Sequence, residues 1–254
     1  MKLKDKNLII VGASSGIGEA LALQLMHQGN KLALFSRREP QLAELKRSLF
    51  IQGDLLSLDQ VKAAAKIFSE SLGRIDGLIF TAGISDYTEV DGFKTQQAVE
   101  MIQVNYFGFL YWVECLLPGF IERREGLIAA VSALGSERGL PRAAAYGASK
   151  AALSYFLESL RIDTRKYGIQ VSDIRPGYVK TPMSEKYHYD QPFLISANEA
   201  AETILRALGK GKTNISFPMG LSILSRLVNL LPNGLYDHLM LKVSEKAHKK
   251  ITKS

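Results

Sequence analysis

The stretch NLIIVGASSGIG, residues 7–18, decides the fold of this chain. Its first five residues, Asn7 to Val11, form a short apolar run that predicts a strand buried on both faces. Three glycines follow at once, and the apolar periodicity from Glu19 to Gln28 predicts a helix. A strand, a glycine-rich turn and a helix in this order begin a dinucleotide-binding unit.

The glycine-rich turn is expected to hold the phosphates of that dinucleotide. Glycine lets the backbone turn tightly and approach phosphate oxygens, and the helix that follows supplies free N–H groups and the positive end of its dipole. A plain glycine turn is the alternative, but the flanking strand and helix favour cofactor binding. The cofactor-binding residues expected here are Gly12, Ser14, Ser15, Gly16, Ile17 and Gly18.

The rest of the chain alternates between short apolar runs and helical periodicity. This alternation favours a parallel sheet with right-handed crossovers, so the predicted fold class is α/β, a doubly wound parallel sheet of Rossmann type. We expect one domain over residues 1–218 and a helical extension over residues 219–254. Further strands are expected at residues 31–35, 50–52, 75–80, 127–131, 169–175 and 214–217, and helices at residues 40–49, 61–71, 94–121, 146–167 and 197–208.

The bulk composition narrows the class of protein. Hydrophobic residues make up 46% and charged residues 22% of the 254 residues, which is typical of a globular protein and not of a disordered chain. The single cysteine, Cys115, excludes an internal disulfide framework, and with no secretory signal at the start it predicts a reducing cytoplasm. Four scattered histidines lack the spacing of metal ligands, and no run reaches the ~18 apolar residues of a membrane-spanning helix.

A second motif, Tyr146-Gly147-Ala148-Ser149-Lys150, opens the helix expected at residues 146–167. A tyrosine and a lysine four residues apart lie on the same face of a helix. Because an ammonium group favours a nearby phenolate, we expect Lys150 to lower the pKa of Tyr146 towards working pH. A tyrosine of that kind can give or take a proton as a carbonyl and an alcohol interconvert. Chance occurrence of the pair is the alternative, and the glycine-rich turn upstream weakens it.

The combination of Gly-x-x-x-Gly-x-Gly and Tyr-x-x-x-Lys resembles the short-chain dehydrogenase/reductase family, over residues 5–218. The resemblance implies hydride transfer between a nicotinamide cofactor and a small-molecule carbonyl or alcohol substrate. It implies that Tyr146 is the general acid/base and that Lys150 also holds the nicotinamide ribose. It further implies a homodimer or homotetramer that shares the helix at residues 146–167.

Other site residues follow from the same resemblance. Asn105 matches an asparagine that holds a water in the proton relay, although a structural asparagine is the alternative. Asp54 is placed at the adenine, but it is also a suitable cap for the next helix, as is Ser57. Thr81 stands where the family has an asparagine that braces the sheet. The cofactor contacts implied are Asp54, Leu55, Ala82 and Gly83, with Pro176, Gly177, Val179 and Thr181 in the loop at the nicotinamide carboxamide.

The end of the second strand indicates which nicotinamide cofactor is used. In a dinucleotide fold, an acidic residue there binds the ribose of NAD, whereas arginine pairs with the 2′-phosphate of NADP. This chain has Ser36 in the acid's place, followed by Arg37 and Arg38. The fork of donors on a guanidinium matches phosphate oxygens, so we predict NADP(H), with Arg37 as the main contact. Two solvated arginines are the alternative.

The expected catalytic serine is the main departure from the family pattern. That serine usually lies thirteen residues before the tyrosine, where this chain has Ala133. Ser132 is the nominal candidate, but strand alternation points its side chain elsewhere, and Ser136 is a further alternative on the loop. The serine donates a hydrogen bond to the carbonyl oxygen as charge develops. Without it, Tyr146 acts alone and the reaction should be slower by about 10²–10³-fold.

The segment after the nicotinamide loop is expected to be a substrate lid, residues 183–196. Its aromatic side chains are suited to an apolar substrate. Those candidates are Tyr187, His188, Tyr189 and Phe193.

The C-terminal extension, residues 219–254, combines apolar residues at helical spacing with a basic end. Amphipathic helices with lysines can lie on an anionic membrane surface. The alternative, which we favour, is that these helices cover the core or a dimer partner, since an apolar stripe is usually buried against protein. The lysines are Lys242, Lys246, Lys249, Lys250 and Lys253.

Two other functions are considered. A cofactor-bound sensor or scaffold without useful turnover is suggested by Ala133 and the apolar extension, although Tyr146, Lys150 and Asn105 argue against it. Nucleic-acid binding rests only on the net charge of +7, and no nucleic-acid-reading motif accompanies the lysines, so we expect no nucleic-acid partner.

Overall fold

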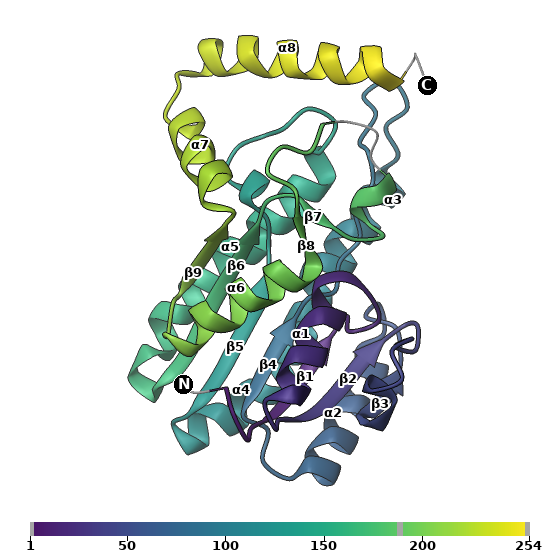
Figure 1. The fold of residues 1–254 in the computed structure, drawn as a ribbon, viewed down its shortest axis with the longest axis vertical. Helices are drawn as coiled ribbons and strands as arrows, with labels where there is room; N and C mark the ends of the chain where they lie inside the picture. The colour runs from purple at the N-terminus through teal and green to yellow at the C-terminus, as the bar shows by residue number, and fades with distance from the viewer. Residues whose placement is uncertain (1–2, 187–189, 252–254) are drawn as a thin grey trace.

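The computed structural model describes residues 3–186 and 190–251, with side chains described as far as residue 245. Within these residues, seven parallel strands form one sheet in the order β3-β2-β1-β4-β5-β6-β9 (Figure 1). The strands are β1 (Asn7–Val11), β2 (Lys31–Ser36), β3 (Leu49–Gln52), β4 (Gly77–Phe80), β5 (Gly126–Val131), β6 (Ile169–Pro176) and β9 (Asn214–Phe217), and a separate parallel pair is formed by β7 (Val179–Lys180) and β8 (Ile195–Ser196).

Helices cover both faces of the sheet (Figure 1). Two of them, α1 and α6, pack together over one face, whereas α2, α4 and α5 share a hydrophobic cluster on the other. The helices are α1 (Gly16–His27), α2 (Leu58–Leu72), α3 (Thr95–Ile102), α4 (Gly108–Arg123), α5 (Ala144–Thr164), α6 (Ala197–Gly209), α7 (Met219–Asn229) and α8 (Asn233–Ile251), and single helical turns lie at Leu45–Arg47, Leu134–Ser136, Arg165–Tyr167 and Ser184–Lys186.

Strand β1 shows why the sheet is buried on both sides. Ile9 and Val11 belong to the hydrophobic cluster under α2, α4 and α5, and Leu8 and Ile10 belong to the cluster under α1 and α6. All four side chains are fully buried. A strand with a helical layer on each face needs apolar residues at every position, so the continuous apolar run follows directly from the fold. The predicted doubly wound parallel sheet is confirmed.

The strand order reverses beside β1, which lies between β2 and β4. In an open parallel sheet, ligands bind in the crevice at the carboxyl ends of the strands where the order reverses. The glycine-rich turn follows β1, and Thr81 follows β4, so both segments lie at this crevice.

One predicted helix is wrong. Residues 40–49 form an irregular segment with a single helical turn, Leu45–Arg47. Leu45 is buried, but most of its neighbours in the segment are exposed. A short helix is marginal without an apolar face to pack, so intrinsic propensity alone did not produce one here.

The long helix predicted over residues 94–121 runs from Thr95 to Arg123, with a π-helical segment, Gln103–Phe107, in its middle. By length and apolar composition this helix resembles a membrane-spanning one. Phe109, Trp112 and Phe120 are nevertheless fully buried in the cluster shared by α2, α4 and α5. We therefore interpret it as a core helix.

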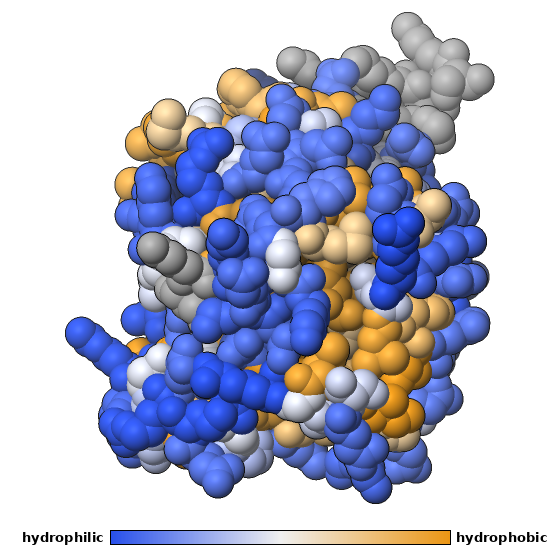
Figure 2. All heavy atoms as spheres, turned by 60° about the horizontal axis from the view of Figure 1, so that its bottom comes forward, coloured by the Kyte–Doolittle hydropathy of each residue, from blue (hydrophilic) through white to orange (hydrophobic). Residues whose placement is uncertain are grey.

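The C-terminal extension is helical, with α7 ending at Asn229 and α8 beginning at Asn233, directly after Pro232. They stand beyond the carboxyl ends of the strands, at the upper end of the molecule in Figure 1. On the face that Figure 2 brings forward, hydrophilic side chains predominate, and an apolar area lies at the right of the view.

Candidate active site

A cavity of about 730 Å³ opens at the carboxyl edge of the sheet. Its walls come from the glycine-rich turn, the ends of β2, β4, β5 and β6, the start of α5, and both helices of the extension. The cavity brings together predicted site residues that are distant in the sequence. They are Gly12, Ser14, Ser15, Gly16, Ile17, Gly18, Ser36, Arg37, Arg38, Asp54, Leu55, Ala82, Gly83, Ser132, Tyr146, Lys150, Pro176, Gly177, Val179 and Thr181.

The glycine-rich turn fits tightly against the end of β4. A Cβ atom on Gly12 would lie 2.5 Å from the backbone nitrogen of Ala82, and one on Gly18 would lie 2.2 Å from the Gly12 oxygen. Gly16 has a φ of +61°, which side chains rarely adopt. These three positions of the turn therefore require glycine.

The start of α1 suits a phosphate group. Ser15 is the N-cap residue, and its side chain makes no capping hydrogen bond. The first N–H groups of a helix carry the positive end of the dipole and bind anions. Because Ser14, Ser15, Gly16 and Ile17 line the cavity, a dinucleotide phosphate fits there.

Thr81 braces the turn. Its Oγ1 donates to the carbonyl oxygen of Val11 at 2.8 Å and also approaches that of Gly12 at 3.2 Å. The hydroxyl thus links the end of β4 to the end of β1. The interpretation that threonine replaces the family asparagine without losing the brace is supported by these contacts.

The end of β2 presents two exposed arginines, Arg37 and Arg38. The hydroxyl of Ser36 is buried and donates to the carbonyl oxygen of Arg38 at 2.6 Å. This bond curls the backbone after the strand, and both guanidinium-bearing residues line the cavity.

Asp54 lines the cavity but does not cap α2. Its Oδ1 accepts a hydrogen bond from the backbone nitrogen of Leu56 at 3.0 Å, which fixes the turn before the helix. Ser57 is the cap, because its Oγ accepts from the backbone nitrogen of Gln60 at 3.3 Å. Of the two capping alternatives, the structure selects Ser57.

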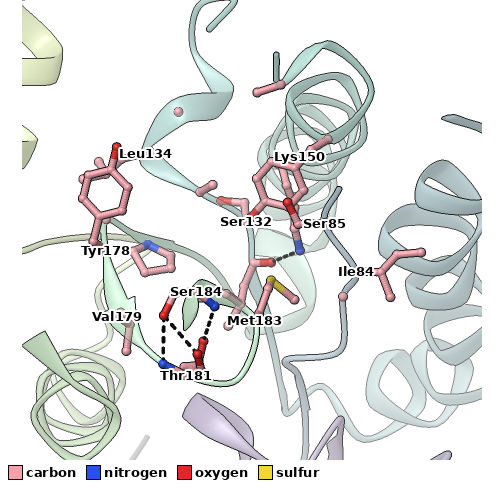
Figure 3. A pocket seen from close by; sticks show the side chains of 18 of the residues that line it. Ile84, Ser85, Ser132, Leu134, Lys150, Tyr178, Val179, Thr181, Met183 and Ser184 are labelled. Atoms are coloured by element: carbon pink, nitrogen blue, oxygen red, sulfur yellow. Dashed lines mark hydrogen bonds between the residues drawn. The ribbon is translucent and has the colours of Figure 1, made fainter. Parts of the chain in front are cut away.

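Tyr146 and Lys150 lie one turn apart at the start of α5, and the Lys150 Nζ is 6.0 Å from the centre of the Tyr146 ring. The lysine side chain is almost fully buried, and its Nζ donates to the carbonyl oxygen of Val131 at 2.8 Å. Burial lowers the pKa of Lys150 to about 8, against the raising effect of the Asp173 carboxylate. Figure 3 shows Lys150 reaching towards the strand end beside Ser132 and Ser85.

Asn105 is fully buried in the π-helical segment and does not line the cavity wall. Its Nδ2 donates to Ser149 Oγ and to the Ile84 carbonyl oxygen, each at 2.9 Å, and its Oδ1 accepts from the Ile84 nitrogen at 2.8 Å. The side chain therefore ties α5, next to Lys150, to the loop after β4. A widened helical turn often marks a functional site, and the three hydrogen bonds of Asn105 account for its presence there despite its poor helix propensity.

The two candidate serines are both engaged by the protein itself. Ser132 is buried, and its Oγ donates to Asp173 Oδ1 at 2.5 Å. Ser136 Oγ donates to the carbonyl oxygen of Ala133 at 2.7 Å. Ala133 lines the cavity at the position where the family serine is expected. A catalytic role for Ser132 stays a prediction, and its bond to Asp173 argues for a structural role.

Sequence reasoning missed several residues at this site. Asp173 lies in β6, and its Oδ2 accepts from Arg175 Nε at 2.6 Å. A carboxylate in the middle of a predicted strand was the available signal. Tyr178, next to Leu134 in Figure 3, also lines the cavity, and burial raises the pKa of its phenol. Three lid candidates, Tyr187, His188 and Tyr189, lie outside the described residues.

Fold and site together define the class of this protein. A Rossmann sheet carries a glycine-rich phosphate cradle at its switch point, and a tyrosine–lysine pair lies in the same cavity. This is the architecture of an oxidoreductase that uses a nicotinamide cofactor. A family model for short chain dehydrogenases matches residues 6–192. The chain belongs to the short-chain dehydrogenase/reductase family.

Individual relatives agree with this assignment. An uncharacterized oxidoreductase of Myxococcus xanthus is 34% identical over 93% of this chain and 96% of its own length. The 11-beta-hydroxysteroid dehydrogenase-like 3 protein of Arabidopsis thaliana is 33% identical over 89% of this chain and 78% of its own length. A short chain dehydrogenase from Burkholderia cenocepacia, solved in complex with NADP, has a TM-score of 0.83 at 24% identity, covering 94% of this chain and 99% of its own.

Proposed function

We propose that this protein is an NADP(H)-dependent oxidoreductase that interconverts a carbonyl compound and an alcohol, with Tyr146 as the general acid/base. One observation carries the proposal. The buried Lys150 ammonium lies beside Tyr146 in the same cavity as the glycine-rich turn. A proton-transfer group and a dinucleotide site thus share one enclosed space, which hydride transfer requires.

The residues of this chain handle the proton in this mechanism. The bound cofactor supplies or accepts the hydride. During reduction, the Tyr146 hydroxyl donates its proton to the carbonyl oxygen, and during oxidation it takes the proton back. The Lys150 ammonium stabilises the negative charge on the phenolate oxygen and also holds the nicotinamide ribose. Asn105 positions the site indirectly, because its side chain donates a hydrogen bond to Ser149, the residue before Lys150 in α5.

Cofactor choice is proposed to depend on Arg37, with Ser36 and Arg38 as helpers. The exposed guanidinium of Arg37 lies at the cavity edge, where a 2′-phosphate would be accessible to it. Arginine binds phosphate through paired hydrogen bonds, so NADP(H) should be preferred over NAD(H). The adenine would lie at Asp54 and Leu55, and the nicotinamide near Ala82, Gly83 and the loop of Pro176, Gly177, Val179 and Thr181.

The substrate is proposed to be an apolar carbonyl or alcohol. The cavity carries apolar side chains on its substrate side, among them Leu134, Tyr178 and Met183, which Figure 3 shows around the opening. The lid over residues 183–196 begins with a turn fixed by Thr181 and Ser184, whose backbone nitrogens each donate to the other's side chain. The steroid-related name of the Arabidopsis relative is consistent with this class of substrate.

Assembly and location are proposed from exposed side chains. Tyr155 and Ile162 are exposed on α5, which supports a homodimer or homotetramer built on that helix. Ile223 and Leu227 on α7, with Leu230 at its C-cap, form an exposed apolar row, which supports peripheral contact of a cytoplasmic protein with a membrane surface. The side chains of Lys246, Lys249, Lys250 and Lys253 lie outside the described residues. Gel filtration tests the assembly, and cosedimentation with anionic vesicles tests the membrane contact.

The primary test is NADPH consumption against a panel of carbonyl compounds, from short ketones to long acyl chains, with a parallel NADH series. Turnover that is faster with NADPH supports the proposal and ranks the substrate classes. If NADPH binds but no compound is reduced, the proposal fails.

A second candidate function is a cofactor-bound sensor or scaffold without useful turnover. The observation in its favour is that Ala133 stands at the serine position while the Ser132 hydroxyl is bonded to Asp173. In a sensor, Tyr146→Phe would leave partner or membrane binding unchanged. In an enzyme, the same variant abolishes turnover.

A further inference from the structure

The C-terminal extension covers the substrate side of the cavity. Its two helices follow β9, the last strand of the sheet, so they are additions to the seven-stranded dinucleotide-binding core. Each helix nevertheless contributes one face to the cavity wall. We infer that α7 and α8 form a roof that selects carbonyl compounds with a long or bulky apolar group, and that Arg138 is the positioning residue that holds this roof closed. The substrate selection rests on the proposed reductase function.

The inner faces of the roof are apolar and regularly spaced. Leu221, Leu224 and Val228 recur at intervals of three and four residues on α7, and all three line the cavity. On α8 the same spacing brings Tyr236, Met240 and Val243 to the cavity. Residues three and four apart lie on one side of a helix, so each helix turns an apolar row towards the cavity, with Ser225, Asn229 and Ser244 also at the wall.

The start of α7 is seated on the proposed nicotinamide loop. A Cβ atom on Gly177 would lie 2.4 Å from Leu221 Cδ2 and 3.4 Å from Leu134 Cδ1. Because glycine has no side chain, Leu221 can pack directly against Gly177. This contact fixes the near end of the roof beside the position where the hydride would be transferred.

The far end of α7 is held by Arg138, on the loop between β5 and α5. Its Nη1 donates to the carbonyl oxygen of Leu231 at 2.6 Å and lies 3.4–3.5 Å from those of Val228 and Asn229. Val228 and Asn229 are the last two residues of α7, whose end carries the negative end of the helix dipole, and Leu231 lies just beyond the helix. A guanidinium satisfies several of these carbonyl groups at once.

Arg138 also contacts the start of α8. Its Nη2 donates to Asn233 Oδ1 at 2.9 Å, and its guanidinium lies 3.7 Å from the centre of the Tyr236 ring. The Tyr236 hydroxyl in turn donates to the carbonyl oxygen of Gly139 at 2.6 Å. One side chain thus joins the end of α7, the start of α8 and the loop that precedes Tyr146.

A second polar connection joins the roof to β6 through Glu137 and Arg175. Glu137 accepts a hydrogen bond from Asn229 at the end of α7 and one from Arg175 Nη1 at 2.7 Å. Arg175 Nε also donates to Asp173, the carboxylate that receives the Ser132 hydroxyl. The roof is therefore tied by polar contacts to the end of β6, whose Asp173 binds Ser132, the residue after the Lys150 partner Val131.

A roof with this inner surface should discriminate by the apolar group of the substrate. Apolar atoms that extend from the carbonyl towards α7 and α8 gain buried contact area, and each buried methylene changes binding by about four- to tenfold. A short ketone does not reach the roof. Opening the roof should therefore raise KM for long-chain ketones and leave short ketones and the hydride-transfer step unaffected.

The test compares Arg138→Ala with Arg226→Ala, a matched loss of one arginine on the exposed side of α7. We expect Arg138→Ala to raise KM for a long-chain methyl ketone by about tenfold, with kcat and NADPH affinity unchanged and KM for butanone unchanged. Arg226→Ala should behave like the wild type. Equal KM values for the two variants, or equal changes for long and short ketones, would overturn the inference.

A second pair of variants acts directly on the roof surface. Val228 lines the cavity, whereas its neighbour Leu227 is 59% exposed. Val228→Trp should fill the space under the roof and raise KM for the long-chain ketone, while Leu227→Trp should not. This pair keeps the test decisive if Arg138→Ala does not fold.

Hydrogen–deuterium exchange tests the roof inference independently of the proposed reductase function. Arg138→Ala should speed exchange in residues 219–245 without changing that of β1 and α1, and a long-chain methyl ketone should slow it in the wild type. If the wild type reduces no ketone yet shows this exchange pattern, the proposed function fails and the roof stands. If Arg138→Ala leaves exchange in residues 219–245 unchanged, the roof inference fails whatever the turnover.

Discussion

The Nζ of Lys150 donates a hydrogen bond to the carbonyl oxygen of Val131, 2.8 Å away at the carboxyl end of β5. This contact fastens the first turns of α5 to the strand that leads into Ala133. It also buries the ammonium group beside the cavity, which accounts for the lowered pKa of Lys150. The position of the lysine is thus set by a strand end, and its ionisation by its burial.

Activity should depend on pH through Lys150. The ammonium form supports Tyr146, and its pKa is about 8 in the folded protein. We therefore expect kcat/KM for ketone reduction to fall as pH rises through about 8, since kcat/KM follows ionisation in the free enzyme. Lys150→Arg keeps its charge at these pH values, so any activity it retains should not fall there. A wild-type profile that is flat between pH 7 and pH 9 would contradict this role for Lys150.

The lowered pKa of Lys150 should also make stability depend on pH, but in the opposite direction to activity. The pKa of Lys150 is 10.5 in an unfolded chain and about 8 when folded, so the unfolded chain binds more protons between these values. The lysine's contribution to the free energy of unfolding should rise with pH in that window. Urea unfolding of the wild type and of Lys150→Met at pH 8 and pH 10 measures the difference, and Lys150→Met should lack this rise.

Removal of the Tyr146 hydroxyl should abolish turnover. Tyr146→Phe keeps the ring and removes the group that exchanges the proton, so kcat should fall by about 10²–10⁴-fold. NADPH affinity, measured by fluorescence titration, should stay close to that of the wild type. Tyr155→Phe, on the exposed side of the same helix, is the matched control. Turnover by Tyr146→Phe at the wild-type rate would rule out this residue as the acid/base.

Restoring the family serine should increase the rate. Ala133 lines the cavity. The hydroxyl groups of Ser132 and Ser136 already donate their protons to other groups of the protein. Ala133→Ser should add a donor to the developing oxyanion and raise kcat by about 10²-fold. Ser132→Ala should change stability more than kcat, because its hydroxyl is bonded to Asp173. A large loss of kcat in Ser132→Ala would instead identify Ser132 as the oxyanion donor.

Cofactor preference should depend on Arg37. Arg37→Ala removes the main predicted contact to the 2′-phosphate, so the Kd for NADPH should rise by about 10- to 100-fold. The Kd for NADH should not change, because that cofactor lacks the phosphate. Arg47→Ala, at the exposed turn before β3, is the control for the loss of one positive charge. An equal effect of Arg37→Ala on both cofactors would mean that Arg37 does not read the 2′-phosphate.

The buried carboxylate of Asp173 should matter for stability. It accepts hydrogen bonds from Ser132 and from Arg175, whose side chain is itself mostly buried. Asp173→Asn leaves the guanidinium of Arg175 with one partner fewer, and the free energy of unfolding should fall by about 3 kcal/mol. Urea denaturation measures this change. Asp163→Asn, an exposed position on α5, should change it by less than about 0.5 kcal/mol.

Local patterns predicted the strands well. Strand β1 occupies Asn7–Val11 as expected, and the glycine-rich turn and the Tyr146–Lys150 helix lie where their patterns indicated. These features were readable because a buried parallel strand, a close backbone approach and a helical face each require particular residue types at fixed short spacings. The helix expected at residues 40–49 did not form, because the segment has no apolar face to pack against the core and helix propensity alone is not sufficient.

The amino-acid sequence by itself determined the fold class, the phosphate cradle and the tyrosine–lysine pair, because each is encoded by residues within a few positions of one another. The pairing of Ser132 with Asp173, 41 positions away, and of Arg138 with the Leu231 carbonyl oxygen just after α7, 93 positions away, became visible only in the folded chain. The extension was expected to cover the core or a partner, yet its inner face lines the active-site cavity. An apolar stripe specifies that a helix will bury one side, but only the packed chain specifies against what.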